Sequence, residues 1–227
     1  MSGRAPPRRS PWLGEGASIG AAPALGSAMA ADRPSPLRNR VRPDGAIVAH
    51  PARGTMMGNR GGRLEGRRQW ASKAWICCLL AFRGRSRDVT GPGYTALFFL
   101  DEATALAAGH RPCFECRRAE ARAFVAAAAR GLGRPEPFRA PDLDARLHAE
   151  RRAAPDPVAP DALPPGAMAA DADGPLLAAR GGLRRWSFEG YGPPVVPRGP
   201  LVALTPPTTR AALAAGFAPR LHPSAFP

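Results

Sequence analysis

The sequence has one lysine, few cysteines and no long apolar run. Lys73 is the one lysine, so 31 of the 32 basic residues are arginines. No apolar stretch approaches the roughly 20 residues that a membrane-spanning helix needs. The chain carries no convincing export signal, so we expect a cytoplasmic protein without membrane contact. In a reducing compartment, the four cysteines are expected to bind a metal rather than to form disulfides.

Negative charge is also scarce. The chain has 18 acidic residues against 32 basic ones, which gives a formal net charge of +14. Arginine, alanine, proline and glycine dominate the composition, as they do in proteins from GC-rich genomes whatever the function. Part of the charge therefore carries no functional meaning. The remaining excess favours a polyanionic partner, because guanidinium groups bind phosphate in a bidentate manner.

Proline and glycine are abundant, with 28 and 25 residues, so much of the chain is expected to be loop. We expect an α+β fold: a small mixed β-sheet with short helices around a zinc site. Residues 1–36 are predicted to be a disordered tail, and residues 37–133 a zinc-binding α+β domain. Residues 134–175 are predicted to form a Pro-rich linker with one short helix, and residues 176–227 a small β/α unit that packs on the core.

Two alternatives concern the first residues of the chain. Arg8 and Arg9 precede a weakly apolar stretch and a cleavage-like site at 28–30, which is the order of a secretory or twin-arginine signal. Glu15 and Pro23 interrupt the apolar stretch, so we favour the disordered tail. Met29 is an alternative start.

The most informative stretch contains all four cysteines. A strand is predicted over residues 94–100 and a short helix over 101–108, with Gly109 as its stop. Cys113 and Cys116 then form a C-x-x-C pair before a predicted helix over 117–130. This spacing, with Pro112 before it, is typical of one half of a zinc site. The basic residues Arg111, Arg117 and Arg118 are expected to lower the thiol pKa and to favour the metal-binding thiolate.

The other half of the site is open between several residues. Cys77 and Cys78 are the natural candidates, but neighbours on a regular strand point to opposite faces. Only one of them would then reach the metal, unless the strand bends. His110 is the nearest alternative ligand, and His50 is another. The alternative to a metal site is four free cysteines, two of them buried as small apolar groups.

A glycine- and arginine-rich loop over residues 53–63 and several further arginines are predicted to contact phosphates of nucleic acid. The loop lacks the Walker A pattern, so it is not a nucleotide P-loop. The alternative is a solvated turn between strands. The predicted nucleic-acid contacts are Arg53, Arg60, Arg63, Arg83, Arg85, Arg87, Arg117 and Arg118.

Two further groups have both a functional and a structural interpretation. Asp144 and His148 are four residues apart on a predicted helix and share a face. They are either an acid–base or metal pair, or part of an ordinary solvated helix, which we favour. Trp186, Phe188 and Tyr191 are candidates for base stacking. Aromatic residues at alternate strand positions are more often core residues.

Residues 98–121, with the run G-H-R-P-C-F-E-C at their centre, resemble the second half of the metal-binding domain of the Ada DNA-repair proteins. The resemblance implies a zinc ion on four thiolates and DNA as the partner. It also implies that the first cysteine, here Cys77, accepts a methyl group from a DNA phosphotriester. The chain departs from the family at Ala81, where the second cysteine would fall, and the methyltransferase domain is absent. The whole chain also resembles a family of uncharacterised bacterial proteins, which implies no activity.

Three functions follow from these observations. We favour a zinc-binding protein that binds nucleic acid, DNA in particular, without catalysis. The second hypothesis is an enzyme: a zinc-thiolate alkyl acceptor that uses Cys77 or Cys78, or a hydrolase that uses Asp144, His148 and a metal. The third is a structural or regulatory adaptor with Pro-rich docking segments.

Overall fold

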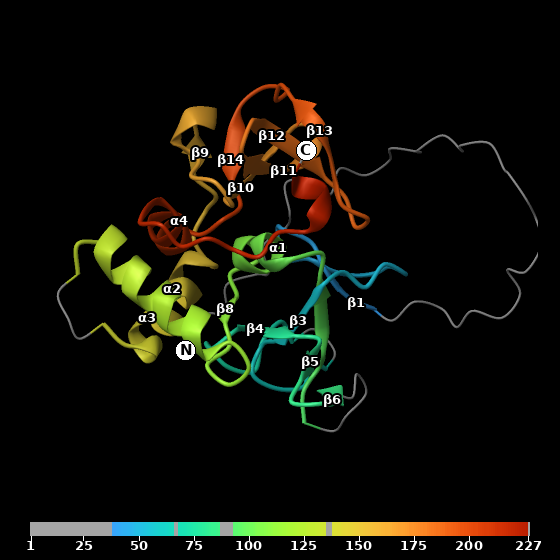
Figure 1. The fold of residues 1–227 in the computed structure, drawn as a ribbon, viewed down its shortest axis with the longest axis vertical. Helices are drawn as coiled ribbons and strands as arrows, with labels where there is room; N and C mark the ends of the chain where they lie inside the picture. The colour runs from blue at the N-terminus through green and yellow to red at the C-terminus, as the bar shows by residue number, and fades with distance from the viewer. Residues whose placement is uncertain (1–37, 66–67, 87–92, 135–137, 227) are drawn as a thin grey trace, which may run out of the picture.

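The computed structural model describes residues 38–65, 68–86, 93–134 and 138–226, arranged as two β-sheets and four α-helices (Figure 1). The predicted tail, residues 1–36, lies outside the described residues. The α+β class is confirmed.

The first sheet is mixed, as predicted. Its strand order is β2-β1-β7-β3-β4-β8, and the pairs β1–β7 and β4–β8 are parallel while the others are antiparallel. The strands are β1 (Arg38–Val41), β2 (Ile47–Ala49), β3 (Met56–Asn59), β4 (Ile76–Leu79), β7 (Leu97–Phe99) and β8 (Arg111–Pro112). A separate two-stranded ribbon consists of β5 (Ala81–Phe82) and β6 (Arg85–Ser86).

The second sheet is antiparallel and has the order β13-β12-β11-β10-β14-β9. Its strands are β9 (Pro157–Val158), β10 (Met168–Asp171), β11 (Gly174–Ala179), β12 (Gly182–Trp186), β13 (Tyr191–Val195) and β14 (Leu201–Ala203). Strands β9 and β10, with the 3₁₀ helix η1 (Pro160–Ala162) between them, come from the range that we predicted to be a linker. All four residues of β10 are buried, so this part of the range belongs to the folded core.

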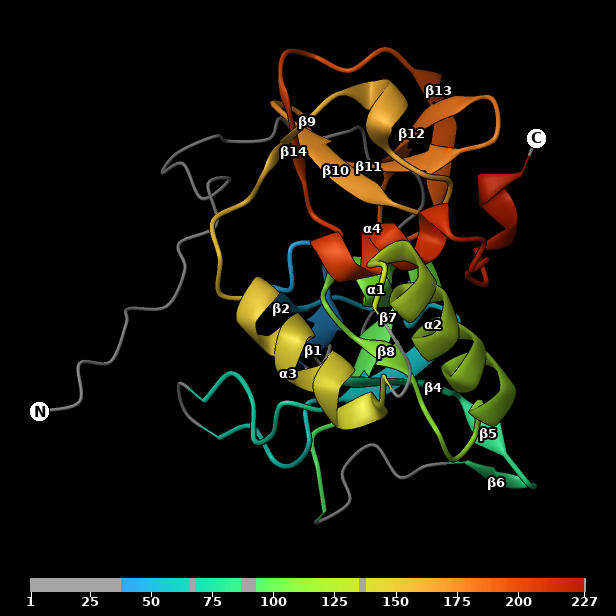
Figure 2. The ribbon, with the colours of Figure 1, turned by 90° about the vertical axis from the view of Figure 1, so that its left-hand side faces the viewer.

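Four α-helices connect and cover the sheets: α1 (Glu102–Ala107), α2 (Arg118–Gly131), α3 (Ala140–Glu150) and α4 (Pro207–Ala214). Helix α1 lies between the two sheets, while α2, α3 and α4 are grouped on one side of the molecule (Figures 1 and 2). A short 3₁₀ helix, η2 (Pro223–Ala225), lies near the end of the chain. No helix in the described part of the chain is long and apolar enough to cross a membrane.

The core is divided among the layers. Phe124, Leu143, Leu147 and Leu213 from the grouped helices pack with Leu176 of the second sheet. Both faces of the first sheet are buried at its centre. One face, with Met56, Cys77, Leu97 and Phe99, packs against Ala105 of α1. The opposite face carries Met57, Cys78 and Phe98, and it also includes Cys113 and Cys116. This second face holds the candidate site.

Candidate metal centre

Three of the four cysteines meet in one buried cluster. The Sγ atoms of Cys78, Cys113 and Cys116 all lie within 4.8 Å of one another. Cys78 is 1% exposed, Cys113 4% and Cys116 7%. Three thiols at this spacing fit the coordination sphere of one metal ion, because thiolates are preferred ligands of zinc and of other soft metals. Within the described ranges, no further histidine, cysteine or carboxylate belongs to the group.

Strand pairing brings the two halves of the cluster together. Strand β4 runs parallel to β8, with Cys77 beside Pro112. The backbone N–H of Cys113 donates a hydrogen bond to the carbonyl of Cys77 at 3.0 Å. This pairing places the C-x-x-C turn directly after the strand that carries Cys78. Residues 35 positions apart in the sequence thereby become neighbours.

Side chains alternate between the two faces of β4, so Cys78 points into the thiol cluster and Cys77 points away from it. Cys78 is paired with Met57 across β3, and both side chains lie on the face of the cluster. The side chain of Cys77 is fully buried on the other face, in the layer against α1. Burial raises the pKa of Cys77, the charge of Glu102 raises it further, and Arg117 acts in the opposite direction. It is the position of Cys77 on the opposite face of β4 that keeps its thiol out of the cluster.

The alternative histidine ligands also lie elsewhere. His110 is fully buried, and its ring packs against Trp75 and Phe99 at centroid distances of 5.1 and 4.7 Å. His50 stacks on Phe188 with ring centroids 4.2 Å apart. Neither belongs to the thiol cluster. His110 is an aromatic core residue, and burial, together with Arg60 and Arg151, lowers its pKa.

Hydrogen bonds within the turn stabilise negative charge on sulfur. The N–H of Glu115 donates to Cys113 Sγ at 3.3 Å. Hydrogen bonds from Cys116 and Cys78, and then from backbone N–H groups, lower the pKa of Cys113. The contact with Cys113 raises the pKa of Cys78 and of Cys116, and the contact with Cys116 raises the pKa of Cys78 further. The three sulfurs thus form a hydrogen-bonded set in which Cys113 is the first to ionise.

Two of the arginines that flank the C-x-x-C pair have other partners. The Nε and Nη2 atoms of Arg111 donate to the two carboxylate oxygens of Asp144 at 2.9 and 2.8 Å. The Nη1 and Nη2 atoms of Arg117 donate to the two carboxylate oxygens of Glu102 at 2.6 and 2.8 Å. Each guanidinium is neutralised by a carboxylate. Our expectation that these two arginines activate the thiols is not supported by the geometry, because their charges are already paired.

The predicted nucleic-acid arginines separate into buried and exposed groups. Arg117 is buried in its pair with Glu102. Arg60 is 1% exposed, lies over the Trp75 ring at 3.9 Å and donates to the carbonyls of Gly45 and Gln69. Burial and the charge of Arg151 lower the pKa of Arg60 to about 9. Arg60 and Arg117 are thus structural residues, which corrects their assignment to a phosphate-binding surface.

The other predicted contacts differ in their surroundings. Arg53, Arg63, Arg83 and Arg118 are exposed. Arg53 lies over the Phe98 ring at 4.6 Å and Arg83 over the Phe82 ring at 5.1 Å. Arg63 pairs with Glu65 at 3.2 Å. Arg85 lies in β6, but its side chain is outside the described part of the structure, as is the whole of Arg87.

The weaker candidate groups are structural. Asp144 is occupied by Arg111, and His148 makes an edge-on contact with Trp70 at 5.4 Å. The indole N–H of Trp186 donates to Thr104 Oγ1 at 3.1 Å. The hydroxyl of Tyr191 donates to Asp101. Both aromatic side chains are buried, so they cannot stack on bases, and the core interpretation of these residues is correct.

A set of buried hydrogen bonds around Asp101 and Glu102, the polar joint between the sheets, was not predicted from the sequence. Asp101 caps α1 by accepting from the Thr104 N–H at 2.9 Å, and it also accepts from Tyr191 and from the His222 N–H. Glu102 accepts from Arg117 and, at 2.8 Å, from the Arg220 N–H. In the sequence these two acids look like ordinary first-turn carboxylates. Their partners lie up to 121 positions away, so no local signal identifies them.

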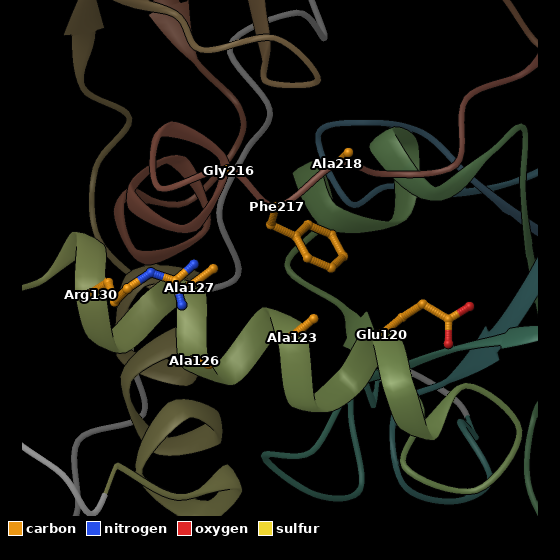
Figure 3. Close-up of a pocket in the computed structure, with 8 residues that line it drawn as sticks. All are labelled: Glu120, Ala123, Ala126, Ala127, Arg130, Gly216, Phe217 and Ala218. Atoms are coloured by element: carbon orange, nitrogen blue, oxygen red, sulfur yellow. The ribbon is translucent and has the colours of Figure 1, made fainter.

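A shallow groove of about 290 Å³ runs along α2 beside the segment that follows α4 (Figure 3). Its floor contains Ala123, Ala127 and Phe217, with Glu120 and Arg130 at its two ends. Both charges have partners within the protein. Glu120 pairs with Arg220, and Arg130 donates to the carbonyl of Ala215 at 3.1 Å. The groove therefore offers no free charged group to a ligand.

Comparison with known protein families, curated proteins and solved structures finds no match. The resemblance to the Ada metal-binding domain stays a prediction from about two dozen residues.

Proposed function

We propose that the protein is a zinc-binding protein in which Cys78, Cys113 and Cys116 hold the ion. The thiol cluster carries this proposal, because three buried sulfurs within 4.8 Å of one another match a ligand set that zinc prefers. The N–H to sulfur bond in the turn compensates part of the negative charge of the bound thiolates. A tetrahedral zinc has a fourth position, which a water molecule would fill.

The test is the zinc content of untagged protein purified under reducing conditions. We expect about one zinc per chain, as in structural and catalytic mononuclear sites. Cys113→Ser and Cys78→Ser should lose most of it. Cys77→Ser and His110→Ala are the matched controls and should retain it. Zinc-free protein, or zinc lost in Cys77→Ser and kept in Cys78→Ser, would contradict the proposal.

We further propose that the partner is nucleic acid, DNA in particular, and that the zinc supports the fold without catalysis. The net charge of +14 and the exposed positions of Arg53, Arg83 and Arg118 support this partner. Stacking on Phe98 and Phe82 orients two of these guanidiniums while leaving them open to solvent. A side chain held in this way loses less entropy when it binds phosphate.

Salt titration of DNA binding tests the partner. Binding should weaken steeply with salt, and combined Arg53→Ala, Arg83→Ala and Arg118→Ala substitutions should reduce the slope by up to about 0.9 per lost phosphate contact. A charge-matched control replaces three other exposed arginines, Arg134, Arg152 and Arg180. The same loss of affinity in both triple variants would show that only net charge matters. Unchanged affinity in the first variant would exclude this surface.

The zinc-thiolate alkyl acceptor remains the second candidate, with one change. The membership of Cys78, and not of Cys77, in the thiol cluster supports Cys78 as the acceptor in this proposal. Intact mass after incubation with methylated DNA tests it. A methyl adduct mapped to Cys78 would support an acceptor, whereas an unchanged mass would leave the non-catalytic function.

A further inference from the structure

Apart from the Glu115 N–H that donates to Cys113 Sγ, the thiol cluster is packed mainly against apolar side chains, which disfavour net charge. Its buried neighbours are Met57 and Phe98 of the first sheet and Ala96, which precedes β7, and the half-buried Ile76 and Leu79 pack against it. Of the three arginines that flank the C-x-x-C pair, Arg111 and Arg117 are neutralised by Asp144 and Glu102, and the side chain of Arg118 is exposed to solvent. An ion bound here is therefore stabilised mainly by its sulfur ligands, and a complex without net charge has the smallest desolvation cost.

The charge and coordination number of the ion decide which complex is neutral. A divalent ion on three thiolates has a net negative charge and leaves a position to be filled by a fourth ligand. Trivalent arsenic forms three bonds to sulfur, needs no fourth ligand and gives a neutral complex. The described residues provide three sulfurs in one group, which is the full set that trivalent arsenic requires.

We propose that Cys78, Cys113 and Cys116 form a binding site for trivalent arsenic. Arsenous acid, As(OH)₃, reacts with the three thiols to give one arsenic atom with three As–S bonds. Each thiol proton leaves with one hydroxyl as water, so three waters are released and no oxidant or reductant is needed. The proposal uses the thiols of the proposed zinc centre but does not require that zinc be present.

Two arsenicals with different thiol requirements provide the test. Arsenite needs three thiols for its full set of sulfur bonds, whereas phenylarsine oxide, C₆H₅AsO, condenses with two thiols and releases one water. Purified wild-type protein should bind one arsenite, seen in native mass spectrometry as a gain of arsenic less three hydrogens. Cys78→Ser retains only the Cys113–Cys116 pair. It should bind arsenite about 100-fold more weakly, on the scale of losing one linked binding contact, and should bind phenylarsine oxide as wild type does.

Cys77→Ala is the matched control, because the neighbouring thiol lies on the opposite face of β4. It should bind both arsenicals with wild-type affinity. Equal arsenite affinity in Cys78→Ser and wild type would overturn the proposal, as would arsenite binding lost in Cys77→Ala and kept in Cys78→Ser. Alkylation mapping on wild type gives a second readout that does not depend on how the variants fold. Arsenite should protect Cys78, Cys113 and Cys116 together, and protection of only two of them would refute a three-sulfur site.

Zinc release separates this inference from the zinc proposal. One zinc released for each arsenic bound supports both. Arsenic uptake by protein that contains no zinc supports the arsenic site and contradicts the zinc centre. Full zinc content with no arsenite binding supports the zinc centre and contradicts the arsenic site.

Discussion

Glu102 forms a buried ion pair with Arg117, the residue that follows the C-x-x-C pair. Its side chain is fully buried, and both carboxylate oxygens accept from Arg117. One of them also accepts from the Arg220 backbone. An isolated charge at this depth is costly, so each member of the pair requires the other.

Glu102→Gln should therefore be strongly destabilising. Glutamine has one oxygen to offer and leaves the Arg117 guanidinium buried with incomplete neutralisation, so we expect the free energy of unfolding to fall by about 3–5 kcal/mol. Glu65→Gln, which breaks the exposed pair with Arg63, should cost less than about 1 kcal/mol. Urea unfolding of both variants measures the difference. An equal loss in the free energy of unfolding of both variants would mean that the buried pair stabilises the fold no more than the exposed pair does.

The C-x-x-C spacing is local, and it predicted that Cys113 and Cys116 act together. The choice between Cys77 and Cys78 stayed open in the sequence, and the Ada resemblance implied Cys77, whose side chain lies on the face opposite the cluster. The pairing of the charges was not predicted. The partners of Arg111 and Arg117 are 33 and 15 positions away. From the neighbouring residues alone, such arginines look like part of an exposed basic surface, whereas the fold buries them in pairs with carboxylates.

Among the elements, α1 shows most clearly how the end of a helix is specified. Its stop is Gly109, at φ +82°, and a Cβ atom there would lie 2.5 Å from Cδ of Arg151. The Arg151 side chain passes over this glycine and donates to its carbonyl at 2.6 Å. Glycine is needed here both for the left-handed backbone and for the space that Arg151 occupies.

Gly109→Ala should consequently cost more than the same change at Gly216, the stop of α4. Gly216 has φ +96° with nothing near its would-be Cβ, so alanine there incurs only the backbone strain of about 1–2 kcal/mol. Gly109→Ala adds overpacking against Arg151 of about 1–3 kcal/mol. Thermal unfolding of both variants and of the Arg151→Ala double variant checks the argument. If removing the Arg151 side chain does not reduce the cost of Gly109→Ala, the contact is not the cause.

Local sequence features, such as helix caps and strand propensity, explain which helices and strands could be predicted. The strand–helix–glycine pattern predicted β7 with α1, because caps and stops are encoded within a few residues. Strand β10 was missed. Its residues Met168–Asp171 include two alanines, which have low strand propensity, and they follow a run of prolines. Burial between β11 and β14 makes this segment a strand, and that pairing is set by the tertiary fold.

At the scale of the whole molecule, the thiol cluster and the second sheet are joined by a continuous chain of contacts. The C-x-x-C turn leads directly into Arg117, whose N–H donates to the Cys113 carbonyl at 3.0 Å. The Arg117 side chain binds Glu102 in α1, which binds the backbone of Arg220. Two residues later, His222 donates to Asp101, and Asp101 accepts from Tyr191 of the second sheet. Figure 1 shows this last segment passing α1 between the sheets.

Removal of the metal should therefore loosen both sheets rather than the turn alone. Without an ion the C-x-x-C turn loses its ligand bonds, Arg117 loses its fixed position, and the Glu102–Arg220 contact weakens with it. We expect chelator-treated protein to show faster hydrogen exchange in β4 and β8 and also in β12 and β13. The thiol of Cys77 should become open to alkylation at the same time, because it is buried between β4 and α1, the helix that carries Glu102. Cys113→Ser, measured without chelator, should reproduce both changes and so excludes a direct effect of the chelator. Faster exchange confined to residues 113–118 would instead show that the metal orders only its own turn, and that the polar joint holds the two sheets together without it.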